Sequence, residues 1–140
     1  MAPRYLIAIL LLGLHTLPAQ ADLRLDALLQ QGVSEYEYGD YQQALEHFSA
    51  ALVHAINADL SRMYPAVYLC AVWHHGKGVE ANRERAAAAC AVTHGQLSLH
   101  QLSLFRDVLE RNSGEQSPLP HKKALADAAS ALSWYLSALP

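Results

Sequence analysis

The sequence has little charge and no excess of basic residues. Lysine and arginine together number 10, against 13 aspartates and glutamates, which gives a net charge of −3 over 140 residues. A protein that binds nucleic acid needs a positively charged surface, so this class is excluded. Two cysteines are too few for a disulfide-rich miniprotein, and the absence of a Gly-X-Y period excludes a collagen-like chain. A hydrophobic content of 52% also excludes an intrinsically disordered chain.

Signals for β-strands are scarce after the first 21 residues. Valine, isoleucine and threonine are uncommon there, and apolar and polar residues do not alternate. Alanine and leucine dominate instead, and apolar residues recur at intervals of three and four. The pattern predicts a single all-α domain with six helices, at about residues 22–38, 41–58, 62–75, 83–94, 97–111 and 121–139.

The N-terminal segment, residues 1–21, has the features of a secretory signal peptide. Arg4 gives a positive start, residues 6–14 are apolar, and Pro18 should break the helix before the Ala19-Gln20-Ala21 cleavage motif. A transmembrane anchor is the alternative, but the apolar run is shorter than the roughly 20 residues that span a bilayer. We therefore expect residues 22–140 to be an exported domain without a transmembrane segment, in the periplasm or secreted, in an oxidising compartment.

Local signals mark the ends of several helices. Gly39 should end the first helix, and Asp40 with Gln43 has the spacing of a capping box at the start of the second. Asn82 is a suitable N-cap for the helix over 83–94, and residues 112–120 are the most loop-like stretch. Apolar faces are expected on the second and last helices, at Leu45, Phe48, Leu52 and Ile56 and at Leu125, Ala128, Leu132, Tyr135, Leu136 and Leu139.

Two adjacent segments carry regularly spaced small residues, aromatic residues and glycines. The first resembles the tetratricopeptide repeat at Gly32, Gly39, Tyr41, Ala44, Phe48 and Ala51. The second resembles the Sel-one-like repeat at Leu69, Cys70, Trp73, Gly76, Gly78, Val79, Asn82, Arg85 and Ala86. In such repeats, small residues let paired helices approach and glycines permit tight turns. The resemblance implies an α/α superhelix of about three stacked antiparallel helix hairpins, with the third hairpin as an atypical C-terminal cap.

The resemblance also implies a non-enzymatic function. An exported protein of this kind is expected to be a scaffold for protein–protein interaction, an adaptor or assembly factor of the bacterial cell envelope, with no cofactor and no bound metal. Its partner would be a protein or peptide that docks on the concave face in extended or helical form. By analogy with the family, the residues of that groove come from the first helix of each hairpin and are Glu35, Tyr38, Val67, Ala71 and His74.

Acidic and aromatic residues alternate near the end of the first helix. The acidic residues are Glu35, Glu37 and Asp40, and the aromatic ones are Tyr36, Tyr38 and Tyr41. One interpretation is a contact patch for a basic segment of a partner. The other is a solvated helix end with tyrosines packed between repeats. The second interpretation is favoured, because aromatic side chains at these spacings mostly pack between helices.

No catalytic motif is found in the sequence. G-x-S-x-G, H-E-x-x-H and the phosphate loop are all absent. Some exported Sel-one-like proteins have been linked to penicillin binding, but the Ser-x-x-Lys and Lys-Thr-Gly elements of penicillin-recognising enzymes are absent too. Binding of a small ligand or metal is the main alternative function, because seven histidines follow residue 21: His47, His54, His74, His75, His94, His100 and His121.

Cys70 and Cys90 are expected to form a disulfide within the second hairpin. The repeat alignment places them at facing positions, and a turn centred between residues 78 and 79 independently sets residue 70 level with residue 87, one helical turn from Cys90. A metal site made of both cysteines with His74 and His94 would need a turn centred near residue 82, inside the following helix. Two buried free thiols are the remaining alternative.

Overall fold

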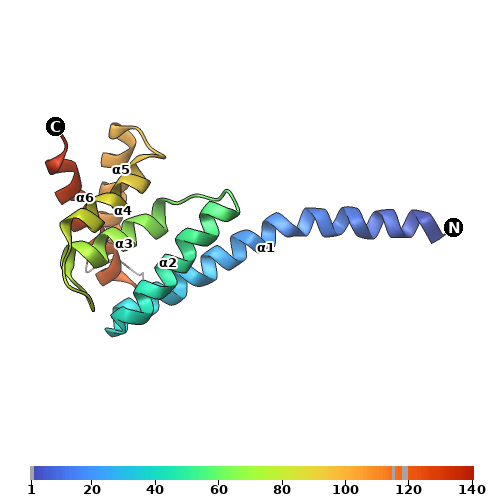
Figure 1. Cartoon of the computed structure of the whole chain (residues 1–140), viewed down its shortest axis with the longest axis horizontal. Helices are drawn as coiled ribbons and strands as arrows, with labels where there is room; N and C mark the ends of the chain where they lie inside the picture. The colour runs from blue at the N-terminus through green and yellow to red at the C-terminus, as the bar shows by residue number, and fades with distance from the viewer. Residues whose placement is uncertain (1, 115, 118–119) are drawn as a thin grey trace.

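The computed structural model describes residues 2–114, 116–117 and 120–140, and for residues 2–18 it describes the backbone alone. The described part of the chain is all-α, as predicted, and contains no strand. Its helices are α1 (Ala2–Tyr38), α2 (Tyr41–Asn57), α3 (Met63–His75), α4 (Arg83–His94), α5 (Leu99–Ser113) and α6 (Lys122–Ala138) (Figure 1). From α2 onward, the predicted ranges agree with these bounds to within about two residues.

Helix α1 is longer than predicted because it begins in the N-terminal segment. It runs without a break through Pro18 and past Ala21, so the helix break expected at Pro18 is absent. A proline inside a helix removes one backbone hydrogen bond, which can leave the helix kinked rather than ended. The N-terminal half of α1 projects beyond the other helices (Figure 1), and the first buried side chain described on it is Leu25. In the part of the chain that the structure describes, no helix is long and apolar enough to cross a membrane.

Consecutive helices pair into three hairpins, α1 with α2, α3 with α4, and α5 with α6. In the first hairpin, a Cβ atom on Gly32 would lie 2.7 Å from Cε1 of Phe48, so the glycine provides the space that the ring fills. Phe48 is fully buried, and its ring stacks on Tyr68 of α3 with centroids 4.9 Å apart. Ala44 and Ala51, on the same face of α2, are also fully buried. These small and large side chains therefore make the close packing for which the repeat pattern selects them.

The turns of the first two hairpins pack against each other. Gly78 has a φ of +70°, and a Cβ atom there would lie 2.6 Å from Cβ of Tyr41. The side-chain amide of Gln42 also donates a hydrogen bond to the carbonyl oxygen of Gly78. Glycine is therefore required at position 78 both by its backbone conformation and by the proximity of the first turn.

The third hairpin does not continue the stack in a regular way. Helix α6, rather than α5, packs on α3, and α6 also contacts α1 and α4. Alanines are buried along α6 at Ala124, Ala128 and Ala131, which lets the neighbouring helices approach closely. As a result, α6 lies across the first helices of both preceding hairpins, where the repeat pattern alone would place an open groove.

The start of α2 differs from the predicted capping box. Asp40 makes no side-chain hydrogen bond to α2. The backbone N–H of Asp40, which Gln43 would have to bind, already donates to the carbonyl oxygen of Glu35 at 2.8 Å. The predicted capping box is therefore absent, and that prediction is wrong. At α4 the prediction is confirmed, because the side chain of Asn82 accepts a hydrogen bond from the N–H of Arg85 at 2.9 Å.

The buried face of α2 is rotated from the predicted one. Leu45 and Leu52 are only half-buried and Ile56 is 45% exposed. The fully buried positions of α2 are Ala44, Phe48, Ala51 and Ala55. Close contact with α1 and α3 favours alanine over leucine on this face, so the largest apolar residues of α2 do not all mark its core side.

Candidate functional site

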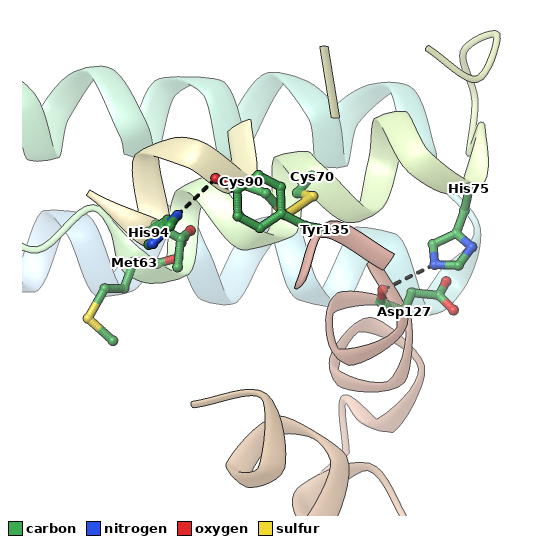
Figure 2. The surroundings of a disulfide bond; sticks show 8 residues. Met63, Cys70, His75, Cys90, His94, Asp127 and Tyr135 are labelled. Atoms are coloured by element: carbon green, nitrogen blue, oxygen red, sulfur yellow. Dashed lines mark hydrogen bonds between the residues drawn. A yellow bond between two sulfur atoms is a disulfide. The ribbon is translucent and has the colours of Figure 1, made fainter. Parts of the chain in front are cut away.

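A disulfide joins the two helices of the second hairpin. Cys70 on α3 and Cys90 on α4 have their sulfur atoms 2.08 Å apart and their Cα atoms 5.3 Å apart (Figure 2). Both side chains are fully buried. This is the pairing that the repeat alignment predicts. Because each sulfur is bonded to the other, neither is available as a thiolate ligand, so the alternative metal site made of both cysteines is not formed.

The histidines of that alternative site contact aromatic residues of α6. Nδ1 of His94 lies 3.0 Å from the hydroxyl oxygen of Tyr135, and Figure 2 shows the two side chains pointing toward each other. The ring of His74 packs against Trp134 with centroids 4.7 Å apart. Within residues 19–114, 116–117 and 120–140, no three potential ligands come close enough to hold a metal ion. His74 and His94 therefore pack between α6 and the second hairpin.

Asp127 connects α6 to both preceding hairpins through hydrogen bonds. The hydroxyl of Tyr36 on α1 donates to Oδ2 of Asp127 at 2.5 Å. Nε2 of His75 on α3 lies 3.1 Å from the carbonyl oxygen of Asp127 and must donate to it, because a carbonyl can only accept (Figure 2). Burial and the Asp127 carboxylate raise the pKa of Tyr36 far above its usual range, so this tyrosine stays a donor at physiological pH.

The N-terminus of α6 is capped by a side chain from α1. The N-cap residue of α6, His121, makes no side-chain capping bond, and Oε1 of Glu37 instead accepts from the N–H of Ala124 at 2.7 Å. The adjacent Lys123 donates a hydrogen bond to the hydroxyl of Tyr41, and its Nζ lies 4.8 Å from the centre of that ring. The end of the first hairpin therefore binds α6 through a carboxylate and a tyrosine ring.

Replacing Glu37 with alanine should lower the free energy of unfolding by about 1 kcal/mol, because the Ala124 N–H loses its acceptor and the α6 dipole loses a nearby negative charge. Urea unfolding monitored by circular dichroism measures the change. Glu37→Gln keeps an acceptor oxygen and should lose less, and Glu46→Ala, on the exposed face of α2, should change little. Wild-type stability of Glu37→Ala would show that Glu37 does not cap α6.

An open cleft of about 650 Å³ lies beside this contact, between α1 and α3. The side chains that define it are Val33, Glu37 and Tyr38 of α1, Tyr64 and Tyr68 of α3, and His121 at the end nearest α6. Tyr64 is held by an edge-to-face contact with Phe105 of α5, with centroids 5.3 Å apart. Tyr68 is held by its stack on Phe48, and the cleft therefore has preformed aromatic walls.

Two of the five predicted groove residues lie on the last two turns of α1 but face different neighbours. Tyr38 lines the cleft and is 84% exposed. Glu35 faces α2 instead, where its Oε1 lies 2.5 Å from Nδ1 of His47, at ion-pair distance but outside hydrogen-bond geometry. Glu35 is therefore not a groove residue, because its position on α1 points it toward the partner helix of its own hairpin.

The other three predicted groove residues lie on α3. Val67 and Ala71 are 0% and 1% exposed, so they are core residues in this structure rather than groove residues. His74 follows them at helical spacing and contacts Trp134 of α6. The reason is the position of α6, which packs on α3 and covers surface that an open superhelix would leave to a partner.

The alternating tyrosines near the end of α1 divide between the two interpretations of the sequence. Tyr36 is 1% exposed and packs edge-on against Tyr41 with centroids 5.1 Å apart, as the packing interpretation expects. Tyr38 and Glu37 line the cleft instead, where a partner could reach them. Successive positions on this helix turn point in different directions, so Tyr36 is buried while Glu37 and Tyr38 face the cleft.

The described lining of the cleft combines three tyrosine side chains with one carboxylate. Burial, the neighbouring Tyr64 and the charge of Glu37 raise the pKa of Tyr68 above its usual range. Tyr68 therefore stays protonated, and thus uncharged, at physiological pH. Glu37 is the single carboxylate among the lining residues described, and none of those residues is a lysine or an arginine.

Stability should decrease as the pH falls through the range where histidine titrates. Burial, His75 and Arg83 lower the pKa of His74 below its ordinary 6.5. The unfolded chain therefore takes up this proton more readily, so the stabilisation is complete above about pH 6.5 and is lost as the pH falls through the folded value. Urea unfolding of wild type and His74→Gln between pH 5 and 8 should show a shallower dependence in the variant. His100→Gln, at an exposed position, should retain the wild-type slope. Equal slopes for all three proteins would contradict this assignment.

The sequence did not mark Tyr64 and Tyr68 as groove residues, and it marked His121 only as one of seven histidines for the alternative ligand or metal function. Tyr64 and Tyr68 are spaced by four on α3 and so share one face, which is a usable signal. Their pairing with Tyr38 across the cleft depends on how the two hairpins pack, and the place of His121 depends on the path of α6. No local pattern encodes either.

Comparisons with protein-family models, with curated proteins and with solved structures find no match to this chain.

Proposed function

We propose that this protein is a helical-hairpin scaffold that binds another polypeptide in the cleft between α1 and α3. The observation that carries the proposal is the composition of this cleft. Tyr38 and Tyr64 are 84% and 40% exposed there, and Tyr64 is held by its ring contacts with Phe105 and Tyr68. Exposed tyrosines in a preformed concave site are typical of protein–protein contacts, because they contribute large contact areas at low entropic cost.

The assignment to tetratricopeptide-like or Sel-one-like repeats is part of the same proposal. It is supported by the close approach of Gly32 and Phe48 and by the glycine required at position 78. Stacked hairpins of this kind typically bind partners along the first helices of successive pairs, and α1 and α3 are those helices here. Helix α6 covers part of that surface, so the cleft is the portion left for a partner.

Export to the cell envelope, most simply to the periplasm, completes the proposal. The buried Cys70–Cys90 disulfide supports it, because such bonds persist in oxidising compartments and are uncommon in the cytosol. The composition of residues 1–21 supports it as well, since a positive start, an apolar run and an A-x-A motif are the features of a secretory leader. The protein would act there as an adaptor or assembly factor.

The test is affinity purification of the tagged exported protein after mild crosslinking in cells. Wild type should return the same envelope polypeptide in replicate experiments, and Tyr38→Ser should lose most of it because the variant removes the exposed ring at the cleft. Val53→Ser is the matched control, since Val53 is 57% exposed on α2, outside the cleft. Recovery that is equal for all three proteins, or indistinguishable from an untagged strain, would count against the proposal.

A further inference from the structure

We propose that the cleft recognises a cationic side chain, an arginine or lysine of the bound polypeptide, held between Tyr38 and Tyr64 and opposite the Glu37 carboxylate. This inference rests on the proposed function and specifies the chemistry of its ligand. It follows from two features of the cleft, the charge of its lining and the exposure of its aromatic rings, and from a lysine that tyrosine rings at the same end of the first hairpin bind outside the cleft.

The described lining of the cleft carries one charge, which is negative, and Lys123 of α6 partly offsets it from outside the cleft. Glu37 contributes one carboxylate, and no lysine or arginine among the lining residues opposes it. Its Oε1 accepts a hydrogen bond from the N–H of Ala124, and the residue also lines the cleft. The field of Glu37 reaches across the cleft, because it contributes to raising the pKa of Tyr68 on the opposite wall. A ligand with a positive charge would complement this field.

The aromatic rings are available to a cation. Tyr38 and Tyr64 keep 84% and 40% of their surface exposed, whereas Tyr68 behind them is 5% exposed. Tyr64 is fixed by its contacts with Phe105 and Tyr68, at centroid distances of 5.3 and 6.3 Å. An ammonium or guanidinium group within about 6 Å of such ring centres is attracted by the negative face of the ring.

The protein already binds one of its own cations with this chemistry. Nζ of Lys123, on α6, lies 4.8 Å from the ring centre of Tyr41 and 5.8 Å from that of Tyr36. The hydrogen bond to Tyr41 and the charges of Asp127 and Glu37 raise the pKa of Lys123. Glu37 thus lies between an aromatic site that holds a lysine of α6 and an adjacent aromatic cleft that is open. A second cation in the cleft would make the same kinds of contact.

Titration of the mature protein with two capped tripeptides, Ac-Gly-Arg-Gly-NH2 and its citrulline analogue, tests the inference by NMR. Citrulline has nearly the shape of arginine but no charge. The arginine peptide should cause saturable shifts at cleft residues, with an affinity about fivefold or more above that of the citrulline peptide. Equal affinities would overturn the inference, as would shifts confined to residues outside the cleft or no saturable shift up to about 10 mM.

Two pairs of variants assign the effect to the proposed groups. Glu37→Gln retains an acceptor for the Ala124 N–H and should weaken arginine-peptide binding about fivefold, whereas Glu46→Gln on the exposed face of α2 should not. Tyr38→Phe should bind as wild type and Tyr38→Leu should bind more weakly, because only the first keeps an aromatic face. Wild-type affinity in both Glu37→Gln and Tyr38→Leu would overturn the inference.

The outcomes for the ligand and for the proposed function are separable. If the crosslinked partner depends on Tyr38 but the two tripeptides bind alike, the interaction function stands and the cationic ligand is wrong. If the arginine peptide binds selectively in the cleft but no partner is recovered from cells, the ligand chemistry stands and the adaptor function is wrong.

Discussion

Phe48→Ala should lower the free energy of unfolding by about 3–5 kcal/mol, the largest effect expected of any single substitution discussed. Phe48 is fully buried where α1, α2 and α3 meet, and its ring contacts Tyr68 at 4.9 Å and Tyr36 at 6.5 Å between centroids. Truncation removes these contacts and leaves a cavity that Gly32, with no side chain, cannot fill. A loss of this size is a large fraction of the stability of a small domain.

Urea unfolding of the protein measures this change directly, with circular dichroism as the signal. Val53→Ala is the matched control on the same helix, because Val53 is 57% exposed and its truncation should cost less than about 0.5 kcal/mol. A cost for Phe48→Ala near that of the control would mean that the ring does not lie at the junction of the first two hairpins.

Removing the disulfide should produce the second largest loss. Replacing both Cys70 and Cys90 with alanine frees a loop whose ends are 20 residues apart. The chain-entropy model then gives a loss of about 3 kcal/mol, and a domain of this size should melt roughly 10 °C lower. Thermal unfolding of wild type and of the double variant, both without reductant, measures the difference.

Thiol counting on the denatured protein, purified without reductant, is the control for that comparison. It should find no reactive thiol before reduction and both thiols after it, because the structure pairs all described cysteines. Two reactive thiols per chain without reductant would contradict the disulfide. In that case the double variant should also melt close to wild type.

The sequence predicts the first two hairpins well because their contacts are close in sequence. Gly32 and Phe48 lie on adjacent helices, so the spacing that brings them together is set by the helical period and one short turn. The pairing of Cys70 with Cys90 is predictable for the same reason, because the two residues lie on helices joined by the next turn. In each hairpin, the turn residues set how the two helices align, and that alignment determines which side chains face each other.

The position of α6 could not be predicted in this way. Its contacts join Asp127 to Tyr36 and His75, over separations of 91 and 52 residues, and no motif specifies them. The apolar stripe of α6 predicts that one face of this helix is buried, and that face is buried in the structure. The stripe does not specify which helices α6 packs against. Val67 and Ala71 were therefore expected in an open groove and lie in the core.

Competition for a backbone N–H group explains why the capping box predicted at Asp40 does not form. The capping box at Asp40 has the right residues, but the Schellman-like turn after α1 uses its backbone N–H for Glu35. A capping box does form between Ser98 and Gln101 at the start of α5, where the backbone N–H of Ser98 remains free for the side chain. Sequence spacing alone does not distinguish the two cases, because the difference lies in the preceding turn.

Site-specific photo-crosslinking tests the central claim, that a polypeptide partner binds in the cleft between α1 and α3, most directly. A photoreactive side chain in place of Tyr38, in the protein produced within cells, should form a covalent product with one other polypeptide. The same side chain in place of Val53 should form none, because Val53 is exposed on α2 and does not line the cleft. A product from position 53 but not from position 38, or the same product in equal yield from both, would contradict the claim.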